Sequence, residues 1–234
     1  MNSIALTLVA LFALVQDQTG AVAAPKTGGW LKRHESFVEE AKTGGFEVLF
    51  QGDSITDGWR NGAAKKIWDA SFAPLKAANF GISGDRTHHV LWRLQNGEFE
   101  GLTLPKVVIL MIGTNNIGQK ENPESAASAI AGIQAIVKEI HKRSEKTKIL
   151  LLGIFPRSEK PDHVFRGMIK EINAEAAKLD DDGKTLRFLD IGEKFLKPDG
   201  TLTKEIMPDF LHLSEKGYQI WADAIKEPLA KLLK

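Results

Sequence analysis

Five short runs rich in β-branched and large apolar residues recur along this chain, separated by longer segments with helical periodicity. The runs are Phe46–Phe50, Ala78–Phe80, Val107–Ile112, Ile149–Leu152 and Leu186–Leu189. The run Val107–Ile112 is continuously apolar, which is typical of a strand covered on both faces. Strand and helix in regular alternation predict an α/β fold in three layers, with a five-stranded parallel sheet between two layers of helices.

The helical candidates between and after these strands are Lys65–Ala70, His88–Leu94, Pro123–Arg143, Val164–Leu179 and Ser214–Leu233. In the longest one, Asn122 suits the N-cap and Pro123 suits the first helical position, where its missing N–H costs nothing. Basic residues fill the last turns of the same segment, where the helix dipole favours cations. The final helix has Ser214 as its expected cap.

The N-terminal residues form a separate segment. Ile4–Val15 is almost entirely apolar but shorter than the roughly 20 residues of a membrane-spanning helix. The small residues of 21–24 follow it, ahead of Pro25. This pattern predicts a signal peptide over residues 1–24, cut near Ala23 or Ala24, and a secreted or periplasmic domain over residues 25–234. The alternatives are an N-terminal core helix and a lipid-facing anchor.

The composition excludes several classes of site. Lys and Arg number 31 and Asp and Glu number 30, a net charge of +1, which argues against nucleic acid or an anionic membrane surface as a partner. The chain has no cysteine, so disulfides, thiolate nucleophiles and thiolate metal sites are ruled out. No segment after residue 25 predicts stable membrane insertion. The sequence does not indicate the oligomeric state, and a homodimer is compatible with it.

In parallel sheets, sites form beyond the carboxyl ends of the strands, so the residues that follow each strand are the candidates for chemistry. Ser54 follows the first strand, where a nucleophile would lie beside backbone N–H groups that can stabilise a negative oxygen. The alternative is that Asp53 and Ser54 only cap a helix. Gly81 and the neighbouring glycine turn follow the second strand, and Asn115 follows the third.

Ahead of the last helix, Asp209 and His212 are three residues apart. Activation of a serine needs an imidazole to take its proton and a carboxylate to orient the imidazole, and this short segment offers both. His88 and His89 are adjacent and would point about 100° apart on a helix, a poor arrangement for a metal. We therefore expect no metal site, and we expect His34, His141 and His163 to be surface residues.

Taken in order, these motifs resemble the SGNH (GDSL-type) hydrolase superfamily from about Gly45 to Leu233. Residues 79–85, 90–94, 113–116 and 209–214 resemble the branch that contains the platelet-activating-factor acetylhydrolase catalytic subunits. The resemblance implies a flavodoxin-like fold, no cofactor, and a catalytic triad of Ser54, Asp209 and His212. It also implies an oxyanion hole made by the backbone N–H groups of Ser54 and Gly81 with the Asn115 side chain.

The substrate is less constrained. Residues near the motifs that could contact it are Asp53, Trp59, Arg86, His88, Ile117 and Phe210. The chain has no long apolar lid, which favours short acyl groups, and by analogy an acetylated carbohydrate is the expected ester. Three alternatives remain: acetyl removal from a phospholipid such as platelet-activating factor, a phosphate- or flavin-binding protein, and a non-catalytic carbohydrate-binding module.

Overall fold

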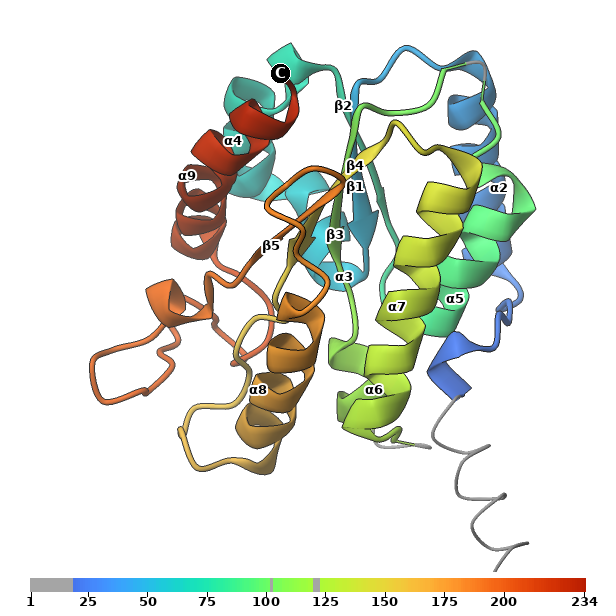
Figure 1. Ribbon diagram of the computed structural model, residues 1–234. Helices are drawn as coiled ribbons and strands as arrows, with labels where there is room; N and C mark the ends of the chain where they lie inside the picture. Colours follow the sequence, from blue (N-terminus) through green and yellow to red (C-terminus); the bar gives the residue numbers. More distant parts are fainter. Residues whose placement is uncertain (1–18, 102, 120–122) are drawn as a thin grey trace, which may run out of the picture.

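The strands form one parallel sheet, as the sequence predicts. In the computed structural model, which describes residues 19–101, 103–119 and 123–234, the strand order is β2-β1-β3-β4-β5 and each neighbouring pair is parallel (Figure 1). The strands are β1 (Val48–Gly52), β2 (Ala77–Gly81), β3 (Val107–Met111), β4 (Lys148–Leu152) and β5 (Leu186–Leu189). Reversal of strand order about β1 brings the carboxyl ends of β1, β2 and β3 together, which is where ligands bind in such sheets.

Helices cover both faces of the sheet, which confirms the three-layer prediction (Figure 1). Along β1, the side chains of Val48 and Phe50 enter one hydrophobic core, and that of Leu49 enters the other. The Leu49 core is covered by α2 (Gly29–Thr43), α5 (Thr87–Arg93), α7 (Ala126–Arg143) and α8 (Val164–Ala177). The opposite core is covered by α4 (Gly62–Ser71) and α9 (Glu215–Leu232).

Short helical turns complete the chain. At the carboxyl end of the sheet lie α3 (Ser54–Asp57) and α6 (Thr114–Gly118). The remaining turns are η1 (Thr19–Ala21), η2 (Gly58–Arg60), η3 (Ala73–Leu75), η4 (Leu94–Glu98) and η5 (Gly192–Phe195).

Two helix starts test the predicted caps. The α9 cap is as expected, because Ser214 Oγ accepts a hydrogen bond from Gly217 N at 3.2 Å. The start of α7 is later than predicted: Ser125 is its N-cap and Pro123 precedes the helix, while Asn122 lies outside the described residues. Ser125 Oγ accepts a hydrogen bond from Ser128 N at 3.0 Å, which satisfies one of the free N–H groups of the first turn.

The helix α2 is absent from the sequence-based prediction. Its buried side chains are Trp30, His34, Phe37 and Ala41, spaced four, three and four residues apart. The spacing is helical, but a histidine occupies one of the four positions and glycines stand at the start. His34 is therefore buried, 4% exposed, and not the surface residue that we expected.

The predicted signal peptide lies mostly outside the described residues, including the whole of Ile4–Val15. Its last residues are described, and they pack on the domain. Gly20 is buried; its N–H donates to Ser128 Oγ at 2.8 Å, and its carbonyl accepts from Thr87 Oγ1 at 2.8 Å. Packing of the described chain therefore begins before residue 25.

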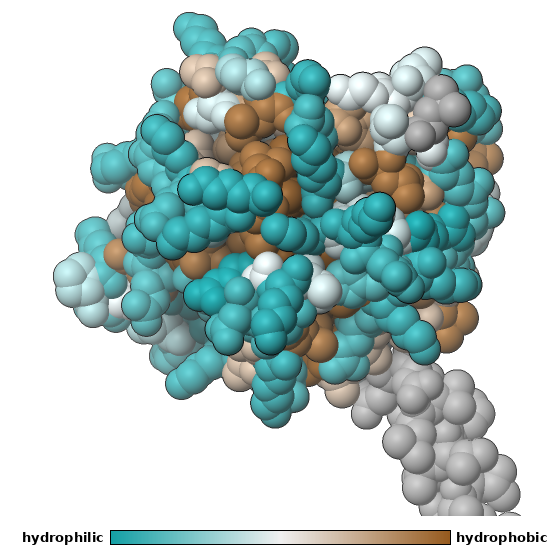
Figure 2. Space-filling model, turned by 45° about the horizontal axis from the view of Figure 1, so that its top comes forward, coloured by the Kyte–Doolittle hydropathy of each residue, from teal (hydrophilic) through white to brown (hydrophobic). Residues whose placement is uncertain are grey.

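Figure 2 views the molecule from nearer the end at which the strands begin. Hydrophilic side chains cover most of this face, and apolar residues show in the gaps between them. Within residues 19–101, 103–119 and 123–234, none of the helices has the length and apolar character needed to cross a bilayer.

Candidate active site

Ser54 stands at the junction between β1 and α3. The carboxylate of Asp53 caps α3 by accepting a hydrogen bond from Ile55 N at 3.0 Å, and Ser54 is the first helical residue. Its N–H belongs to the first turn, where amides have no partner within the helix and point outward. A Cβ on Gly52 would lie 2.2 Å from Thr56 Oγ1, so this sharp turn requires glycine.

Ser54, His212 and Asp209 form one hydrogen-bonded chain. Ser54 Oγ lies 2.9 Å from His212 Nε2, and His212 Nδ1 lies 2.7 Å from Asp209 Oδ2. The other carboxylate oxygen, Asp209 Oδ1, accepts from the backbone N–H groups of Leu211 at 3.0 Å and His212 at 2.7 Å. The backbone of the loop therefore fixes the carboxylate, and the carboxylate orients the imidazole toward the serine.

Both side chains of the His212–Asp209 pair are open to solvent: 45% of the His212 side chain and 56% of the Asp209 side chain are exposed. Partial burial of Asp209 favours its neutral form, but the hydrogen bonds from the His212 ring and backbone hold the pKa of Asp209 below its usual value. An ionised Asp209 stabilises the Nδ1–H tautomer of His212. That tautomer leaves Nε2 free to accept the hydroxyl proton of Ser54.

Gly81 does not have the geometry that the resemblance implies. Its N–H donates to Asn79 Oδ1 at 2.9 Å inside the buried end of β2, so it is not available to an oxyanion. The reason for glycine here is packing, since a Cβ would lie 2.3 Å from Asp57 N in α3. The expected oxyanion role of Gly81 is therefore wrong.

Gly84, three residues later, is a candidate donor in its place. Its positive φ of 75° is a conformation that glycine adopts without strain, and in the described part of the chain its N–H has no hydrogen-bond acceptor. Asn115 lies beside this turn, since its Nδ2 donates to the carbonyl of Asp85 at 3.0 Å. An amide nitrogen carries two hydrogens, so this bond orients the Asn115 side chain and leaves one hydrogen to donate.

The cavity that includes Ser54 and His212 has a volume of about 360 Å³. Apart from Leu213, its wall is built from small, polar or aromatic residues, and from the sequence we expected none of the wall residues to contact substrate: Asp57, Gly58, Asn61, Gly62, Ala63, Ala64, Ser83, Leu213, Glu215 and Tyr218. The concentration of small residues at 61–64, just after the serine motif, was the available signal.

None of the six residues expected to contact substrate lines this cavity. Trp59 and Ile117 are 1% and 2% exposed and pack in the two hydrophobic cores, so a contact with substrate is wrong for both. Asp53 is fully buried behind Ser54. Bulky apolar residues beside a motif complete the core here and do not form the pocket.

The other three expected contacts are also absent from the lining of the cavity. The Arg86 guanidinium donates to Glu124 Oε1 at 3.0 Å and to Gln119 Oε1 at 2.9 Å, and the His88 ring lies 3.5 Å from the same glutamate. The Phe210 backbone has a φ of 59° in the loop between Asp209 and His212, and its ring is half-buried. The structure does not bring these side chains into the cavity.

The Asp53 carboxyl group is the most perturbed acid near Ser54. Burial, together with the nearby negative charge of Asp85, raises the pKa of Asp53 to about 7. Asp53 Oδ1 is bound by Ile55 N, whereas Asp53 Oδ2 has no hydrogen-bond partner among the described residues.

The comparison with protein families is decisive. The GDSL-like lipase/acylhydrolase family matches residues 50–220, which include the serine, glycine, asparagine and Asp-x-x-His motifs. The chain belongs to this family. It is a carboxylic ester hydrolase of the GDSL type.

Similar curated proteins support this assignment over nearly the full chain. The GDSL-like enzyme is 37% identical over 219 residues to human platelet-activating factor acetylhydrolase IB subunit alpha1, across 94% of this chain and 88% of that subunit. It is 38% identical over 207 residues to the rat subunit alpha2, across 87% and 85% of the two chains.

Solved structures share the fold. A GDSL-like lipase from Bacteroides thetaiotaomicron superposes with a TM-score of 0.67 at 20% identity, covering 86% of this chain and 97% of that one. A catalytic mutant of an acetylxylan esterase from Geobacillus stearothermophilus gives a TM-score of 0.60 at 20% identity, covering 81% and 94%. At this identity, the likeness concerns the fold alone.

The comparison also corrects the expected location. The curated relatives of the GDSL-like enzyme are platelet-activating factor acetylhydrolase IB subunits, and they conflict with the secreted or periplasmic location that we predicted from the apolar N-terminal run. The packing of residues 19–24 on the domain agrees with this correction, because the predicted cut near Ala23 or Ala24 would remove Gly20 from its contacts.

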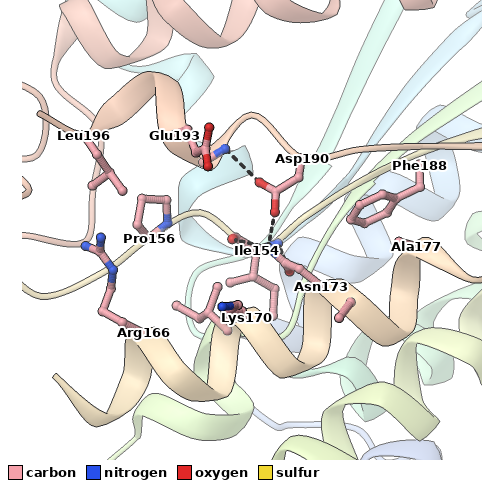
Figure 3. A pocket seen from close by; sticks show the side chains of 13 residues that line it. Ile154, Pro156, Arg166, Lys170, Asn173, Ala177, Phe188, Asp190, Glu193 and Leu196 are labelled. Carbon is pink, nitrogen blue, oxygen red and sulfur yellow. Dashed lines mark hydrogen bonds between the residues drawn. The ribbon is translucent and has the colours of Figure 1, made fainter. Parts of the chain in front are cut away.

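A second cavity, of about 440 Å³, lies beyond the carboxyl ends of β4 and β5 (Figure 3). It is lined by α8 and by the segment after β5, where the Asp190 carboxylate accepts from Asn173 Nδ2 at 2.9 Å and from Gly192 N at 2.8 Å. Its described lining has neither serine nor histidine, so it offers the GDSL-like enzyme no nucleophile and base.

The two adjacent histidines of α5, His88 and His89, have partners on their own helix. In the described parts of the chain, no three His, Asp or Glu side chains are grouped to hold a metal ion. His88 and His89 instead contact each other, with 3.1 Å between their Nε2 atoms, and His89 Nδ1 accepts from Arg86 N. Burial, with the neighbouring His88, lowers the pKa of His89 to about 2, which keeps the ring neutral.

Proposed function

We propose that this enzyme hydrolyses short-chain esters, acetyl esters above all, by two-step acyl transfer through Ser54. The observation that carries the proposal is the hydrogen-bonded chain from Ser54 Oγ to His212 Nε2, 2.9 Å, and from His212 Nδ1 to Asp209 Oδ2, 2.7 Å. A nucleophile, a base within reach of its proton and a carboxylate that orients the base are the three parts that serine activation needs.

In the first step, His212 Nε2 takes the Ser54 hydroxyl proton while Ser54 Oγ bonds to the ester carbonyl carbon. The carbonyl oxygen becomes an oxyanion, and its donors are Ser54 N–H, Gly84 N–H and the second Asn115 Nδ2 hydrogen. Collapse of this intermediate breaks the bond to the alcohol, which leaves with the proton from His212. The product is an acyl-serine.

In the second step, water replaces the alcohol. His212 removes a proton from the water, which attacks the acyl-serine carbonyl through the same oxyanion arrangement. When this intermediate collapses, Ser54 Oγ recovers the proton from His212 and the carboxylic acid leaves. The negative charge of Asp209 stabilises the imidazolium in both steps without being protonated.

The shape of the cavity supports a short acyl group. Its lining includes the small residues Gly58, Gly62 and Ala63, and its volume is about 360 Å³. Such a space is at the lower end of the volumes of small-molecule pockets. Because it is open to solvent at His212, the alcohol part of the ester can extend outward.

Two acetyl donors are favoured by different comparisons. The curated relatives at 37–38% identity are named platelet-activating factor acetylhydrolase subunits, which favours an acetylated phospholipid. The acetylxylan esterase from Geobacillus stearothermophilus favours an acetylated carbohydrate, at lower identity. The preference for carbohydrate in the sequence analysis depended partly on secretion, which is corrected, so we place the acetylated phospholipid first.

The test of the chemistry is hydrolysis of p-nitrophenyl acetate and p-nitrophenyl octanoate by the wild type and by Ser54→Ala. We expect fast release from the acetate, slow release from the octanoate and loss of both in the variant. Equal activity of wild type and variant would contradict the role of Ser54.

The test of the substrate uses two natural types of ester. Acetate release is measured from a 2-acetyl phospholipid below its critical micelle concentration and from acetyl-xylooligosaccharides at equal concentration. A higher kcat/KM for the phospholipid supports our first choice, and a higher value for the oligosaccharide replaces it with the second. Ser54→Ala serves as the blank in both arms.

A further inference from the structure

Arg93, on α5, is buried beneath the active site with 0% of its side chain exposed. Its Nη1 donates to the carbonyl of Phe80 at 2.8 Å, and its Nη2 donates to the carbonyl of Gly52 at 3.3 Å. These carbonyls belong to the next-to-last residue of β2 and to the last residue of β1. One guanidinium therefore links the ends of the two strands, and the Gly52 carbonyl is two residues before Ser54.

The same guanidinium reaches the glycine turn. Arg93 Nε lies 3.0 Å from Asp85 Oδ2, and Trp30 Nε1 donates to Asp85 Oδ1 at 2.6 Å. The carboxylate of Asp85 is thus held from two sides. Its backbone carbonyl accepts from Asn115 Nδ2 at 3.0 Å, and its backbone follows Gly84 directly. Both donors that we assign to the turn side of the oxyanion site adjoin Asp85.

A second buried acid completes the cluster. Glu98 accepts from Arg93 Nη1 at 2.9 and 2.8 Å, from Gln51 Nε2 at 3.1 Å, and lies 3.0 Å from His34 Nδ1. Burial alone would lower the pKa of Arg93, but Glu98 and Asp85 raise it above its ordinary value. The cation is therefore permanent, and its donors are fixed in the plane of one rigid group.

We propose that Arg93 is a positioning residue for ester hydrolysis. Through the Gly52 carbonyl it holds the segment that leads to Ser54 (the Ser54 arm), and through the Asp85 carboxylate it holds the turn with Gly84 and Asn115 (the Gly84–Asn115 arm). It thereby fixes the positions of these two arms of the oxyanion site relative to each other. This inference rests on the proposed function. Arg93 contacts neither Ser54, His212 nor Asp209 in the described structure, so its effect on the reaction passes through the backbone of the two arms.

The chemistry of the side chain explains why arginine is needed. Its guanidinium carries five N–H donors in a planar fork. Here it donates hydrogen bonds to two backbone carbonyls and to Glu98, and it forms an ion pair with Asp85. A lysine keeps the charge but has three donors at one nitrogen, so it cannot link all four acceptors. A displacement of about 1 Å in a positioned group costs up to about 10²-fold in rate.

The test compares Arg93→Lys with the wild type for hydrolysis of p-nitrophenyl acetate and for phosphorylation by diethyl p-nitrophenyl phosphate. In that reaction, His212 takes the Ser54 hydroxyl proton as Ser54 Oγ bonds to phosphorus, p-nitrophenolate leaves, and the phosphoryl oxygen takes the place of the oxyanion. We expect kcat and the phosphorylation rate constant to fall together by about 10- to 100-fold, while KM changes by less than about threefold.

Two further variants separate positioning from stability. Glu98→Gln removes one buried charge but leaves the links from Arg93 to Gly52 and Asp85, so we expect a lower Tm with kcat within about threefold of wild type. Arg143→Lys makes the same substitution at an ion-paired arginine on α7, bound to Glu139 and Glu100, and serves as the control with unchanged kinetics.

Each result is decisive. If Arg93→Lys keeps kcat and the phosphorylation rate within threefold, or if Glu98→Gln loses kcat in proportion to its Tm, the cluster acts on stability alone and the inference fails. If Arg93→Lys does not fold, Asp85→Asn tests the same link, and a loss of kcat below threefold overturns it. A wild type without activity would instead refute the proposed function.

Discussion

Two sets of charged side chains lie at the same end of the sheet, and they differ in nearly every physical respect. His212 and Asp209 are about half exposed on a loop, 45% and 56% of their side chains, whereas Asp85, Arg93 and Glu98 are fully enclosed at 0% each. The first pair is held mainly by the backbone of its own loop. The second cluster is held by residues from β1, β2, α2 and α5.

The difference shows how one fold divides two tasks. A base that takes a proton and returns it to a leaving group must be reachable by substrate and water, and exposed ion pairs contribute little to stability, about 0–1 kcal/mol. Ions sealed in the core are costly to separate, which makes them suited to holding backbone segments in fixed positions. The exposed pair is therefore expected to control activity and the buried cluster to control geometry and stability.

The largest expected effect is on kcat, and it comes from the exposed pair. His212→Ala removes the base while 45% of the side chain is in solvent. We expect kcat for p-nitrophenyl acetate to fall by about 10⁴- to 10⁶-fold and the free energy of unfolding to change by less than about 1 kcal/mol. Steady-state kinetics and urea denaturation measure the two. A residual kcat within tenfold of wild type would break the contrast.

Loss of a charge in the buried cluster should, in contrast, lower the free energy of unfolding strongly. Arg93→Met leaves Glu98 without the guanidinium and leaves Asp85 with Lys26 Nζ, 3.4 Å away, as its nearby cation. We expect the free energy of unfolding to fall by about 3–5 kcal/mol, as for other broken buried pairs. Asp209→Ala is the control and should lose less than about 1 kcal/mol. Urea denaturation followed by tryptophan fluorescence gives both values. Equal losses in the two variants would show that burial does not separate the roles.

Asn115 lies between the two sets, because its amide is oriented by the Asp85 carbonyl and is proposed to donate to the oxyanion. Asn115→Ala should lower kcat by about 10²- to 10³-fold with little change in KM. The measurement is steady-state hydrolysis of p-nitrophenyl acetate. A loss below tenfold would remove Asn115 from the oxyanion site and leave it as a purely structural link.

The last expected effect concerns pH and Asp53. Burial raises its pKa to about 7 in the folded protein, while the unfolded chain has the ordinary value near 3.8. Between these values the folded protein binds more protons than the unfolded one, so this group makes the free energy of unfolding fall as pH rises from about 4 to 7.

Asp53→Asn keeps an oxygen to cap Ile55 N and removes the titration. We expect the variant to lose less stability than wild type over that pH range, with the two converging below pH 4. Parallel urea titrations at several pH values provide the comparison. Identical pH profiles would show that Asp53 does not keep its proton in the folded state.

The parallel sheet was predictable because its strands carry continuous apolar runs, as at Val107–Met111, and a run this short suits a buried strand better than a helix. The helix α2 was not, because its buried stripe includes His34, which is satisfied by Glu98, 64 residues away. A polar residue with a distant partner gives no local signal of burial. The same limit hides Arg93, whose partners come together only in the folded sheet.

At the site, the local motifs were informative and their neighbours were not. The three-residue spacing of Asp209 and His212 gave the correct pairing, since both lie on one loop. The prediction for Gly81 was wrong because a glycine in a turn has two possible reasons: it can present a free N–H to a ligand, or it can let another backbone segment come close. Only the structure separates them, since a Cβ on Gly81 would lie too close to Asp57 N. Trp59 misled us because proximity in sequence does not reveal which face of the chain meets substrate.

The most direct test of the central claim is covalent labelling of the serine. The purified protein is treated with an equimolar alkyl fluorophosphonate and digested, and the modified peptide is sequenced by mass spectrometry. The account predicts one adduct per chain, on Ser54, with labelling slowed by orders of magnitude in His212→Ala. Absence of an adduct on Ser54, or labelling that is equally fast in His212→Ala, would contradict the claim that Ser54 is a nucleophile activated by His212.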